Sequence, residues 1–137
     1  MAFNISRKNN FLNISFPAAL SYVDRAADET KKFLSSLGLE RYAFNVVLGL
    51  REAMNNAVMS GCNQNQTKTI TYHLQYGNDR LIMTVEDEGD GFDWQQYLGK
   101  EPPAHAESGR GLPIMEEYFE MIWFNEKGNK VVLVKLL

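Results

Sequence analysis

The stretch Arg51-Glu52-Ala53-Met54-Asn55-Asn56-Ala57 decides how this sequence is interpreted, because it puts an acid and two amides into an otherwise apolar helical pattern. Glu52 and Asn56 are four residues apart, so they share one face of a helix. An amide oxygen is a hard ligand that suits Mg²⁺, and a nearby glutamate can orient or deprotonate a hydroxyl or a water. Asn55 lies near the same face, so the spacing leaves the choice between the asparagines open, and a solvated helix face has the same pattern.

This stretch belongs to a segment, residues 40–62, that is apolar over most of its helical circumference. We therefore expect a largely buried helix there, with Phe44 among its apolar residues. The polar or small residues of the segment recur every three or four positions, so they form one stripe along the helix. A buried helix with such a stripe usually faces water, a partner strand or a ligand. The stripe consists of Asn45, Gly49, Glu52, Asn56, Ser60 and Asn63.

A second stretch, Val85-Glu86-Asp87-Glu88-Gly89-Asp90-Gly91-Phe92, ends an alternating apolar pattern. Counting by two from Val85 reaches Asp87, so we expect its side chain on the covered face of a sheet. A carboxylate buried without a partner is costly, and a carboxylate accepts hydrogen bonds from an exocyclic amine such as that of adenine. Gly89 and Gly91 would let the backbone pass close to a flat ring. An acidic turn between strands is the alternative interpretation.

The third stretch, Ser108-Gly109-Arg110-Gly111-Leu112, comes just before Pro113, which we expect to start a short helix to about residue 119. The free N–H groups and the positive dipole at such a helix start suit phosphate oxygens. No Gly-Lys-Ser or Gly-Lys-Thr follows, which excludes a P-loop, and the glycines do not link a parallel strand to a crossover helix as in a Rossmann site. A flexible turn before a helix is the alternative.

The pattern of the whole chain predicts the order β-α-α-β-β-loop-α-β-β within one domain, residues 1–137. Such an order indicates an α+β two-layer sandwich, with helices on one face of a mainly antiparallel, mixed sheet. We expect strands over residues 12–16, 70–76, 81–87, 121–124 and 131–136. Helices are expected from Pro17 to a stop at Gly38, over residues 40–62 and over residues 113–119, with an irregular loop or lid over residues 89–111.

The composition excludes several classes of protein. A net charge of −3 argues against a nucleic-acid-binding protein, which usually has a basic face. The single cysteine, Cys62, cannot form an internal disulfide and suggests a small buried residue in a reducing compartment. No signal-peptide pattern is present and the longest apolar runs are too short for a bilayer, so we expect a soluble cytoplasmic protein without a membrane partner. The two histidines, His73 and His105, lack a ligand cluster, so no zinc site is expected.

The three stretches in this order resemble the motifs of the GHKL, or Bergerat-fold, ATPases, and most of all those of the bacterial anti-sigma-factor serine/threonine kinases. The resemblance covers nearly the whole chain and implies that it binds ATP and Mg²⁺. It implies Glu52 as the catalytic base or polarising residue, Asn56 rather than Asn55 as the Mg²⁺ ligand, and Asp87 on the adenine amine. The first glycine box would contain Gly89 and Gly91, and the second, at the phosphates, would contain Gly109, Arg110, Gly111 and Leu112.

The same resemblance implies a kinase that phosphorylates a STAS-domain anti-sigma factor antagonist, with a sigma factor as the alternative partner and a homodimer as the frequent state. The chain departs from the family pattern at Ser60, where a histidine is common, and in a short lid without threonine. These departures leave open a partner-sequestering module that binds nucleotide without transferring phosphate. The ATP-binding domain of a histidine kinase is disfavoured, because no phospho-accepting hairpin precedes the domain. The polar candidates in the lid are Lys100, His105, Glu107 and Ser108.

Overall fold

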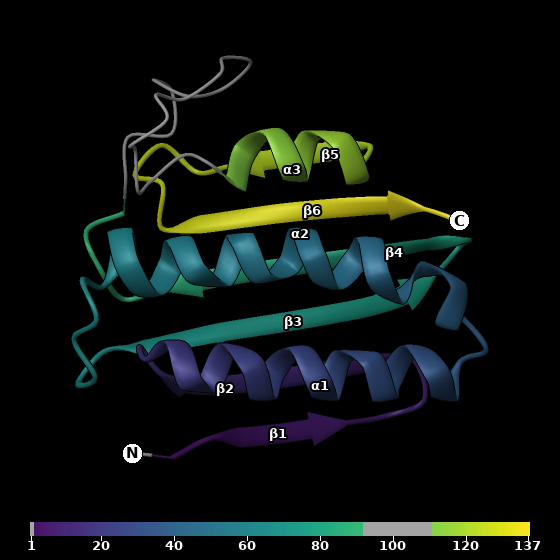
Figure 1. The fold of residues 1–137 in the computed structure, drawn as a ribbon, viewed down its shortest axis with the longest axis horizontal. Helices are drawn as coiled ribbons and strands as arrows, with labels where there is room; N and C mark the ends of the chain where they lie inside the picture. Colours follow the sequence, from purple (N-terminus) through teal and green to yellow (C-terminus); the bar gives the residue numbers. More distant parts are fainter. Residues whose placement is uncertain (1, 92–110) are drawn as a thin grey trace.

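The computed structural model describes residues 2–91 and 111–137, the side chains of 111–113 excepted. Within these residues, three helices lie side by side on one face of a six-stranded sheet (Figure 1). The strand order is β1-β2-β3-β4-β6-β5, and each pairing between neighbours is antiparallel. The predicted α+β two-layer arrangement is therefore confirmed. The strands are β1 (Asn4–Arg7), β2 (Phe11–Pro17), β3 (Thr69–Gly77), β4 (Arg80–Asp87), β5 (Met121–Phe124) and β6 (Lys130–Leu136).

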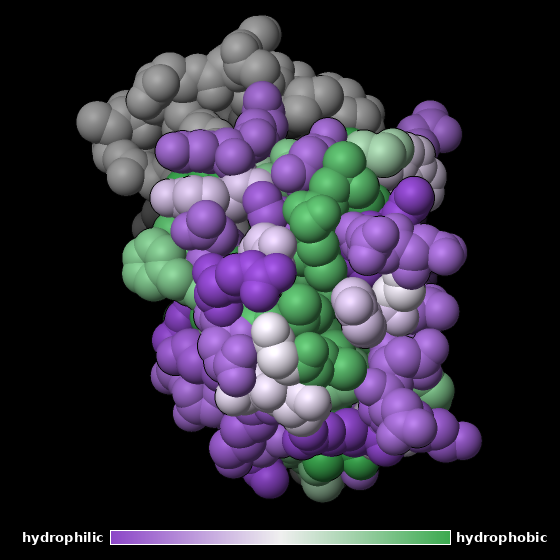
Figure 2. All heavy atoms as spheres, turned by 90° about the vertical axis from the view of Figure 1, so that its right-hand side faces the viewer, coloured by the Kyte–Doolittle hydropathy of each residue, from purple (hydrophilic) through white to green (hydrophobic). Residues whose placement is uncertain are grey.

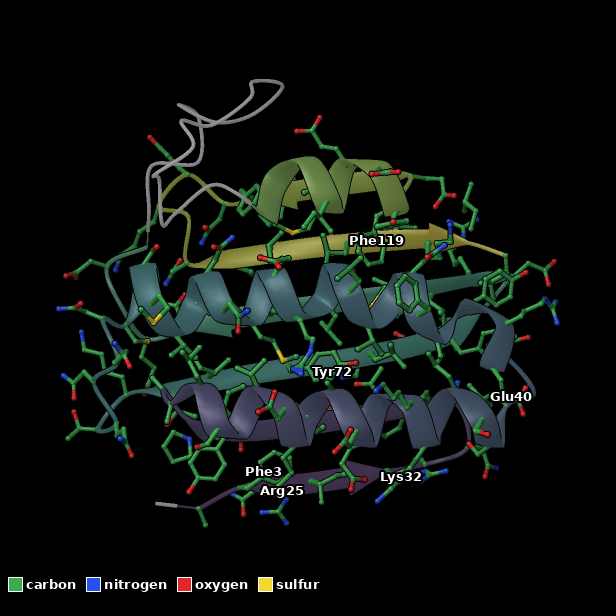
Figure 3. The ribbon with its side chains drawn as sticks, viewed as in Figure 1. Phe3, Arg25, Lys32, Glu40, Tyr72 and Phe119 are labelled. Carbon is green, nitrogen blue, oxygen red and sulfur yellow. The ribbon has the colours of Figure 1, made fainter. Side chains whose placement is uncertain are left out.

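Strand β1 was missed by the sequence analysis, which began the sheet at residue 12. All four of its residues are exposed, and a strand that buries neither face carries no apolar alternation. The segment is held instead by Phe3, whose ring stacks on Phe16 at 6.1 Å between centroids and lies 4.1 Å below the guanidinium of Arg25. Figure 3 shows Phe3 and Arg25 together beside α1.

Helix α1 (Leu20–Ser36) starts later than predicted. Pro17 is not its first residue: it ends β2, paired with Thr69, and Ala19 is the N-cap. A proline has no N–H to donate, which suits the end of a strand as well as the start of a helix. The predicted stop at Gly38 is confirmed, because this residue has a φ of +72°, in the region that glycine favours.

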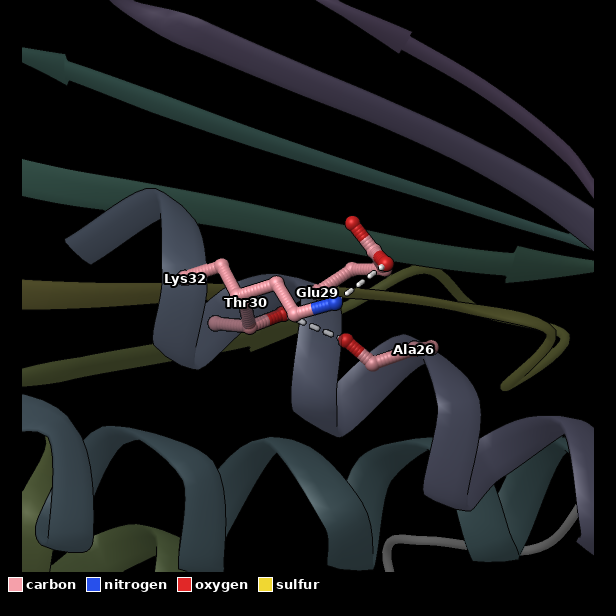
Figure 4. A network of polar contacts seen from close by, with 4 residues as sticks. All are labelled: Ala26, Glu29, Thr30 and Lys32. Atoms are coloured by element: carbon pink, nitrogen blue, oxygen red, sulfur yellow. Dashed lines mark hydrogen bonds and ion pairs between the residues drawn. The ribbon is translucent and has the colours of Figure 1, made fainter. Parts of the chain in front are cut away.

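The two sides of α1 differ as its amphipathic pattern requires. On the buried side, the hydroxyl of Thr30 donates to the carbonyl of Ala26 at 2.8 Å and lies 2.9 Å from the Tyr72 hydroxyl of β3. On the other side, Lys32 and Glu29 form an exposed ion pair at 3.4 Å (Figure 4). Tyr72 is fully buried beneath the helices (Figure 3), and burial raises the pKa of its hydroxyl. The core therefore lies between the helix layer and the sheet.

The predicted second helix is present as three joined segments. These are a 3₁₀ turn (η1, Glu40–Tyr42), the helix α2 (Ala43–Asn56) and a π-helical turn (η2, Ala57–Gly61). Phe44 was wrongly expected in the core: it is 74% exposed, because it falls on the opposite side of α2 from Val46, Leu50 and Ala53. The π turn widens the end of this helix next to Asn56, and such turns occur frequently at functional sites.

Helix α3 (Gly111–Tyr118) begins two residues before Pro113, the expected first residue. It lies alongside α2, and the contact is closest at Gly49 of the predicted stripe. A Cβ on Gly49 would come within 2.1 Å of Cε2 of Phe119, so only glycine leaves room for this ring. Figure 3 shows Phe119 over α2. One position of the stripe therefore faces another helix.

The interior is mainly apolar, with Thr30, Asn56 and Asp87 as buried polar residues. Seen from the end of the molecule (Figure 2), a stripe of hydrophobic side chains has hydrophilic ones on both sides. This is the pattern expected where the space between a helix layer and a sheet reaches the surface. None of the helices in the described part of the chain combines the length and the apolar character that a membrane span requires.

Candidate functional site

A cleft lies between the last turns of α2 and the neighbouring strands β4 and β6. Part of the cleft is open to solvent. Two residues from separate predicted motifs, Asn56 and Asp87, line it together. Its other walls include Met115 of α3 and Asn129 of the turn between β5 and β6.

Asp87 is the last residue of β4, and its side chain is on the covered face, as the alternation predicted. The residue is only 5% exposed. The backbone N–H of Gly89 donates to its Oδ1 at 2.8 Å, and the thiol of Cys62 donates to the same oxygen at 3.8 Å. Among residues 2–91 and 114–137 we find no hydrogen bond to Oδ2. Among these residues, one carboxylate oxygen therefore accepts hydrogen bonds from the protein and the other accepts none.

Burial raises the pKa of the Asp87 carboxyl from an ordinary 3.8 to about 6. The N–H of Gly89, the Cys62 thiol and the positive charge of Lys127 act in the opposite direction, and Glu86 adds to the increase. The desolvation of the charged form is the largest of these effects. A carboxylate with a pKa this far above normal is typical of a functional position.

The backbone of Asp87 is fixed by the turn between β5 and β6. Its N–H donates to the carbonyl of Asn129 at 2.9 Å, and Nδ2 of Asn129 donates to the carbonyl of Asp87 at 3.1 Å. Oδ1 of Asn125 accepts from the N–H groups of Gly128, Asn129 and Lys130, at 2.8, 3.1 and 3.2 Å. This turn is a wall of the cleft that the sequence analysis missed. An asparagine followed by Gly-Asn at a hairpin was the only signal for it.

Gly89 and Gly91 lie where the chain leaves β4, and both contact other parts of the protein. A Cβ on Gly89 would come within 1.7 Å of the Gly61 carbonyl oxygen. A Cβ on Gly91, which has a φ of +77°, would come within 2.0 Å of the Lys127 carbonyl oxygen. Close packing within the protein thus accounts for both glycines. Their expected approach to a flat ring stays a prediction.

Gly61 is a further residue that the sequence analysis did not single out. A Cβ at this position would come within 2.5 Å of Oδ2 of Asp87. The N–H of Asp90 also donates to the carbonyl of Gly61 at 3.0 Å. The end of the π turn therefore packs directly against the acid and against the chain that follows it.

Asn56 ends α2, and its side chain is 9% exposed. Its Nδ2 has no hydrogen-bond partner in the part of the chain that the structure describes. Buried amides are nearly always satisfied, so this one indicates a missing partner. Rotation of the amide exchanges its nitrogen and oxygen ends, so the same position can present a hard oxygen ligand. Asn55 is partly exposed and does not line the cleft.

Glu52 lies one turn before Asn56 on α2 and is half-buried. Burial raises the pKa of its carboxyl, and the charge of Arg51 opposes this increase. The guanidinium of Arg51 is engaged with α1, where Nη1 and Nη2 donate to Oδ1 of Asp24 at 2.7 and 2.6 Å. The acid is thus less well solvated than a surface glutamate, a property suited to proton transfer near neutral pH.

The third predicted stretch is described only in part. Gly109 and Arg110 lie outside the described residues, as do the lid candidates Lys100, His105, Glu107 and Ser108. Gly111 and Leu112 form the first turn of α3, the helix that also brings Met115 to the cleft. A helix start at this stretch is thus confirmed, while its contact with phosphates stays a prediction.

Comparisons with known proteins identify the relatives of this chain. The family described as Histidine kinase-like ATPase domain matches residues 16–135. The chain is 30% identical to the Serine-protein kinase RsbW of Bacillus subtilis (strain 168) over 95% of this chain and 89% of that protein. It is 27% identical to the same kinase of Bacillus velezensis, over 97% of this chain and 89% of that protein. It is 22% identical to the Anti-sigma F factor of Clostridium perfringens, over 95% of this chain and 89% of that protein.

These matches span the cleft and nearly the whole sheet. The chain therefore belongs to the family of histidine kinase-like ATPase domains, the GHKL group with the Bergerat fold. Within this group it belongs with the anti-sigma-factor kinases, as the three sequence motifs implied.

Proposed function

We propose that this chain, acting as one domain, is a protein serine/threonine kinase that binds Mg-ATP in the cleft between α2 and β4. The observation that carries the proposal is that two polar groups from separate motifs line one cleft: the amide of Asn56, whose Nδ2 has no hydrogen-bond partner in the described part of the chain, and the carboxylate of Asp87. A buried amide without a partner and a buried carboxylate with a free oxygen both cost free energy in the absence of a ligand. A ligand that has an amine at one end and a Mg²⁺ ion on its phosphate oxygens at the other would satisfy both.

The base would bind at Asp87. Its Oδ2 would accept a hydrogen bond from the exocyclic amine of adenine, while Oδ1 stays with Gly89. Guanine has a carbonyl at the corresponding ring position. Its oxygen and the carboxylate oxygen are both acceptors, so they could not form a hydrogen bond with each other. This chemistry supports ATP over GTP. Gly89 and Gly91 would line the turn that passes the ring.

The phosphates would bind between α2 and the start of α3. Asn56 would hold Mg²⁺ through its amide oxygen, which is a hard ligand. When bound, the ion would neutralise charge on the phosphate oxygens, which the chain itself, with a net charge of −3, does little to offset. The backbone N–H groups of Gly109, Arg110, Gly111 and Leu112 would donate to the same oxygens at the positive end of α3.

Glu52 would act as the base for phosphoryl transfer. A serine or threonine hydroxyl of the partner would attack the γ-phosphorus, forming a new P–O bond as the bond to the β–γ bridging oxygen breaks. The hydroxyl proton would pass to Glu52, and ADP would leave. The raised pKa of Glu52 supports this role, because a stronger base accepts the proton more readily.

The partner would be a STAS-domain anti-sigma factor antagonist, and the chain would hold a sigma factor when the antagonist is phosphorylated. One relative is named a serine-protein kinase and another an anti-sigma factor, and these two names support the two proposed activities in turn. A phosphate added at a packed interface weakens it by charge and desolvation, which would release the antagonist and switch partners. Such a system would operate in the cytoplasm, and a homodimer is the expected state.

The test is phosphorylation of a purified cognate STAS-domain antagonist by the wild-type chain with Mg-ATP labelled at the γ-phosphate. Acid-stable label on serine or threonine is the expected result. Tight Mg-ATP binding without any label on the antagonist would favour the partner-sequestering module, an alternative that Ser60 and the short lid support. Acid-labile label on histidine would favour a histidine kinase domain.

A further inference from the structure

Cys62 follows directly after the π turn η2, and its side chain contacts the carboxylate of Asp87. The N–H of Cys62 donates to the carbonyl of Ala57 at 2.9 Å, five residues earlier, so the π turn sets the position of this side chain. The residue is 2% exposed, and its Sγ is 3.8 Å from Oδ1 of Asp87. This is the only cysteine of the chain, and neither the motifs nor the proposed chemistry uses it.

The two oxygens of Asp87 have different surroundings. Oδ1 accepts two hydrogen bonds, from the N–H of Gly89 and from the Cys62 thiol. Within residues 2–91 and 114–137, Oδ2 accepts none, and the backbone of Gly61 packs so close to it that a Cβ there would come within 2.5 Å. The two donors at Oδ1 and the close backbone of Gly61 therefore fix the plane of the carboxylate.

We propose that Cys62 is a positioning residue for nucleotide binding: its thiol, together with the N–H of Gly89, holds Oδ1 of Asp87, so that Oδ2 is presented to the amine of the base. The proposal rests on the proposed function and adds to it a residue from the helix end. The unpartnered amide of Asn56, also about nine-tenths buried and in the same cleft, independently indicates that a ligand binds there.

The thiol has to be protonated to donate, and its surroundings keep it so. Burial and the charge of Asp87 raise the pKa of Cys62 to about 11, against smaller effects of the Glu88 backbone and of Lys68 in the opposite direction. At neutral pH the side chain is therefore a neutral S–H group, a weak donor beside a carboxylate. The same raised pKa makes it a poor nucleophile, which argues against a redox role.

A donor to the ionised carboxylate lowers the pKa of that acid and favours the form that binds the base. Removing the thiol should therefore shift the ionisation of Asp87 to higher pH. The other charged groups that act on this acid are Lys127 on the turn between β5 and β6 and Glu86 on β4. Both are unchanged in a Cys62 variant, so the shift isolates the effect of the thiol.

The experiment compares the wild type with Cys62→Ala and Cys62→Ser. The ¹³C carboxyl signal of Asp87 is titrated in the nucleotide-free protein, and calorimetry measures Mg-ADP affinity from pH 5 to pH 8. In Cys62→Ala the midpoint moves above the wild-type value of about 6, and affinity at pH 6 falls roughly two- to fivefold, as expected for one weak hydrogen bond. In Cys62→Ser, whose hydroxyl also donates, both quantities return toward the wild type.

Val46→Ala is the matched control, because it also shortens a fully buried side chain of the same helical segment, far from the cleft. It should lower thermal stability without moving the titration midpoint. An unchanged midpoint and affinity in Cys62→Ala would overturn the assignment of Cys62 alone. Equal effects of the Ala and Ser variants would also overturn it, because a donor would then be irrelevant. Absence of Mg-ADP binding to the wild type would instead overturn the proposed function, and with it the role of Cys62 in binding.

Discussion

The N–H of Gly89 donates to Oδ1 of Asp87 at 2.8 Å, so the acid at the end of β4 is oriented by the chain two residues further on. This is the local geometry by which an aspartate side chain replaces a backbone turn. It makes the two carboxylate oxygens inequivalent, since Oδ1 accepts the hydrogen bond of the turn and Oδ2 does not. A substitution at this position therefore has a defined outcome.

We expect Asp87→Asn to abolish nucleotide binding and keep the fold. The amide would keep its oxygen toward the N–H of Gly89, which puts Nδ2 in the place of Oδ2 and sets donor against donor at the adenine amine. Loss of a charge-assisted hydrogen bond with such a mismatch should cost about 100-fold or more in affinity. Calorimetry with Mg-ADP measures this loss, with the exposed Asp28→Asn as control. Unchanged affinity would remove Asp87 from the site.

The same acid makes the stability of the nucleotide-free protein depend on pH. Its pKa of about 6 exceeds the ordinary value of 3.8, so the folded protein binds this proton more tightly than the unfolded chain does. Protonation of Asp87 therefore stabilises the folded protein fully below about pH 4, and this stabilisation is lost as the pH rises through 6. The asparagine of the variant does not titrate, so only the wild type should lose stability as the pH rises. We therefore expect the free energy of unfolding of Asp87→Asn, relative to that of the wild type, to increase by about 3 kcal/mol from pH 3.5 to pH 7. Urea unfolding at several pH values tests this, and a flat difference would contradict the raised pKa.

The unpartnered amide of Asn56 gives a prediction in which stability and binding change in opposite directions. Asn56→Leu removes a buried polar group that lacks a partner, so we expect the nucleotide-free protein to gain about 1 kcal/mol in the free energy of unfolding. The same variant should lose magnesium-dependent ATP binding. Asn55→Leu is the control, because Asn55 is partly exposed and does not line the cleft. Retention of magnesium-dependent binding by Asn56→Leu would contradict the proposed ligand.

Periodicity in the sequence predicted the side-chain positions that depend on local geometry alone. The alternation of β4 put Asp87 on the covered face, and the helical spacing put Glu52 and Asn56 on one side of α2. Both follow from the fixed repeats of strands and helices, which require no knowledge of the neighbours. The exposed β1 strand and the start of α1 after Pro17 were missed or misplaced, because neither leaves an apolar repeat.

The contacts that orient the acid could not be predicted in this way. The residues that touch Asp87 or its backbone, namely Gly61, Cys62 and Asn129, lie 25 to 42 positions away in the chain. Such pairings depend on how the helix end and the last hairpin pack, and no local pattern encodes them. The glycines after β4 illustrate the point, since their nearest neighbours are the backbones of Gly61 and Lys127.

We expect Glu52→Ala to bind Mg-ATP and to lose phosphoryl transfer. The side chain is half-buried on α2, one turn from Asn56, and its removal leaves the groups proposed for the base and the metal in place. Loss of a general base lowers kcat by about 10²- to 10⁴-fold. Transfer of labelled phosphate to the antagonist, measured beside nucleotide affinity, tests this, with the exposed Glu40→Ala as control. Undiminished transfer would exclude Glu52 from the mechanism.

The packing of Phe119 on Gly49 predicts how the cleft depends on α3. A Cβ on Gly49 would come within 2.1 Å of the Phe119 ring, so Gly49→Ala has to displace the ring or the helix. Such overpacking costs about 1–3 kcal/mol, which exceeds the gain of up to about 1 kcal/mol from replacing a helical glycine. Because α3 also brings Met115 to the cleft, Mg-ADP affinity should fall as well.

A double-mutant cycle separates this contact from a general loss of stability. Phe119→Leu makes room for the added methyl group, so Gly49→Ala should cost about 1 kcal/mol less in that background than in the wild type. Gly77→Ala is the matched control, because a Cβ there has no atom within 4 Å and should leave stability nearly unchanged. Chemical unfolding of the five proteins measures all of these differences. Additive costs would show that the ring does not occupy the space beside Gly49, and α3 would then have no defined position relative to Asn56.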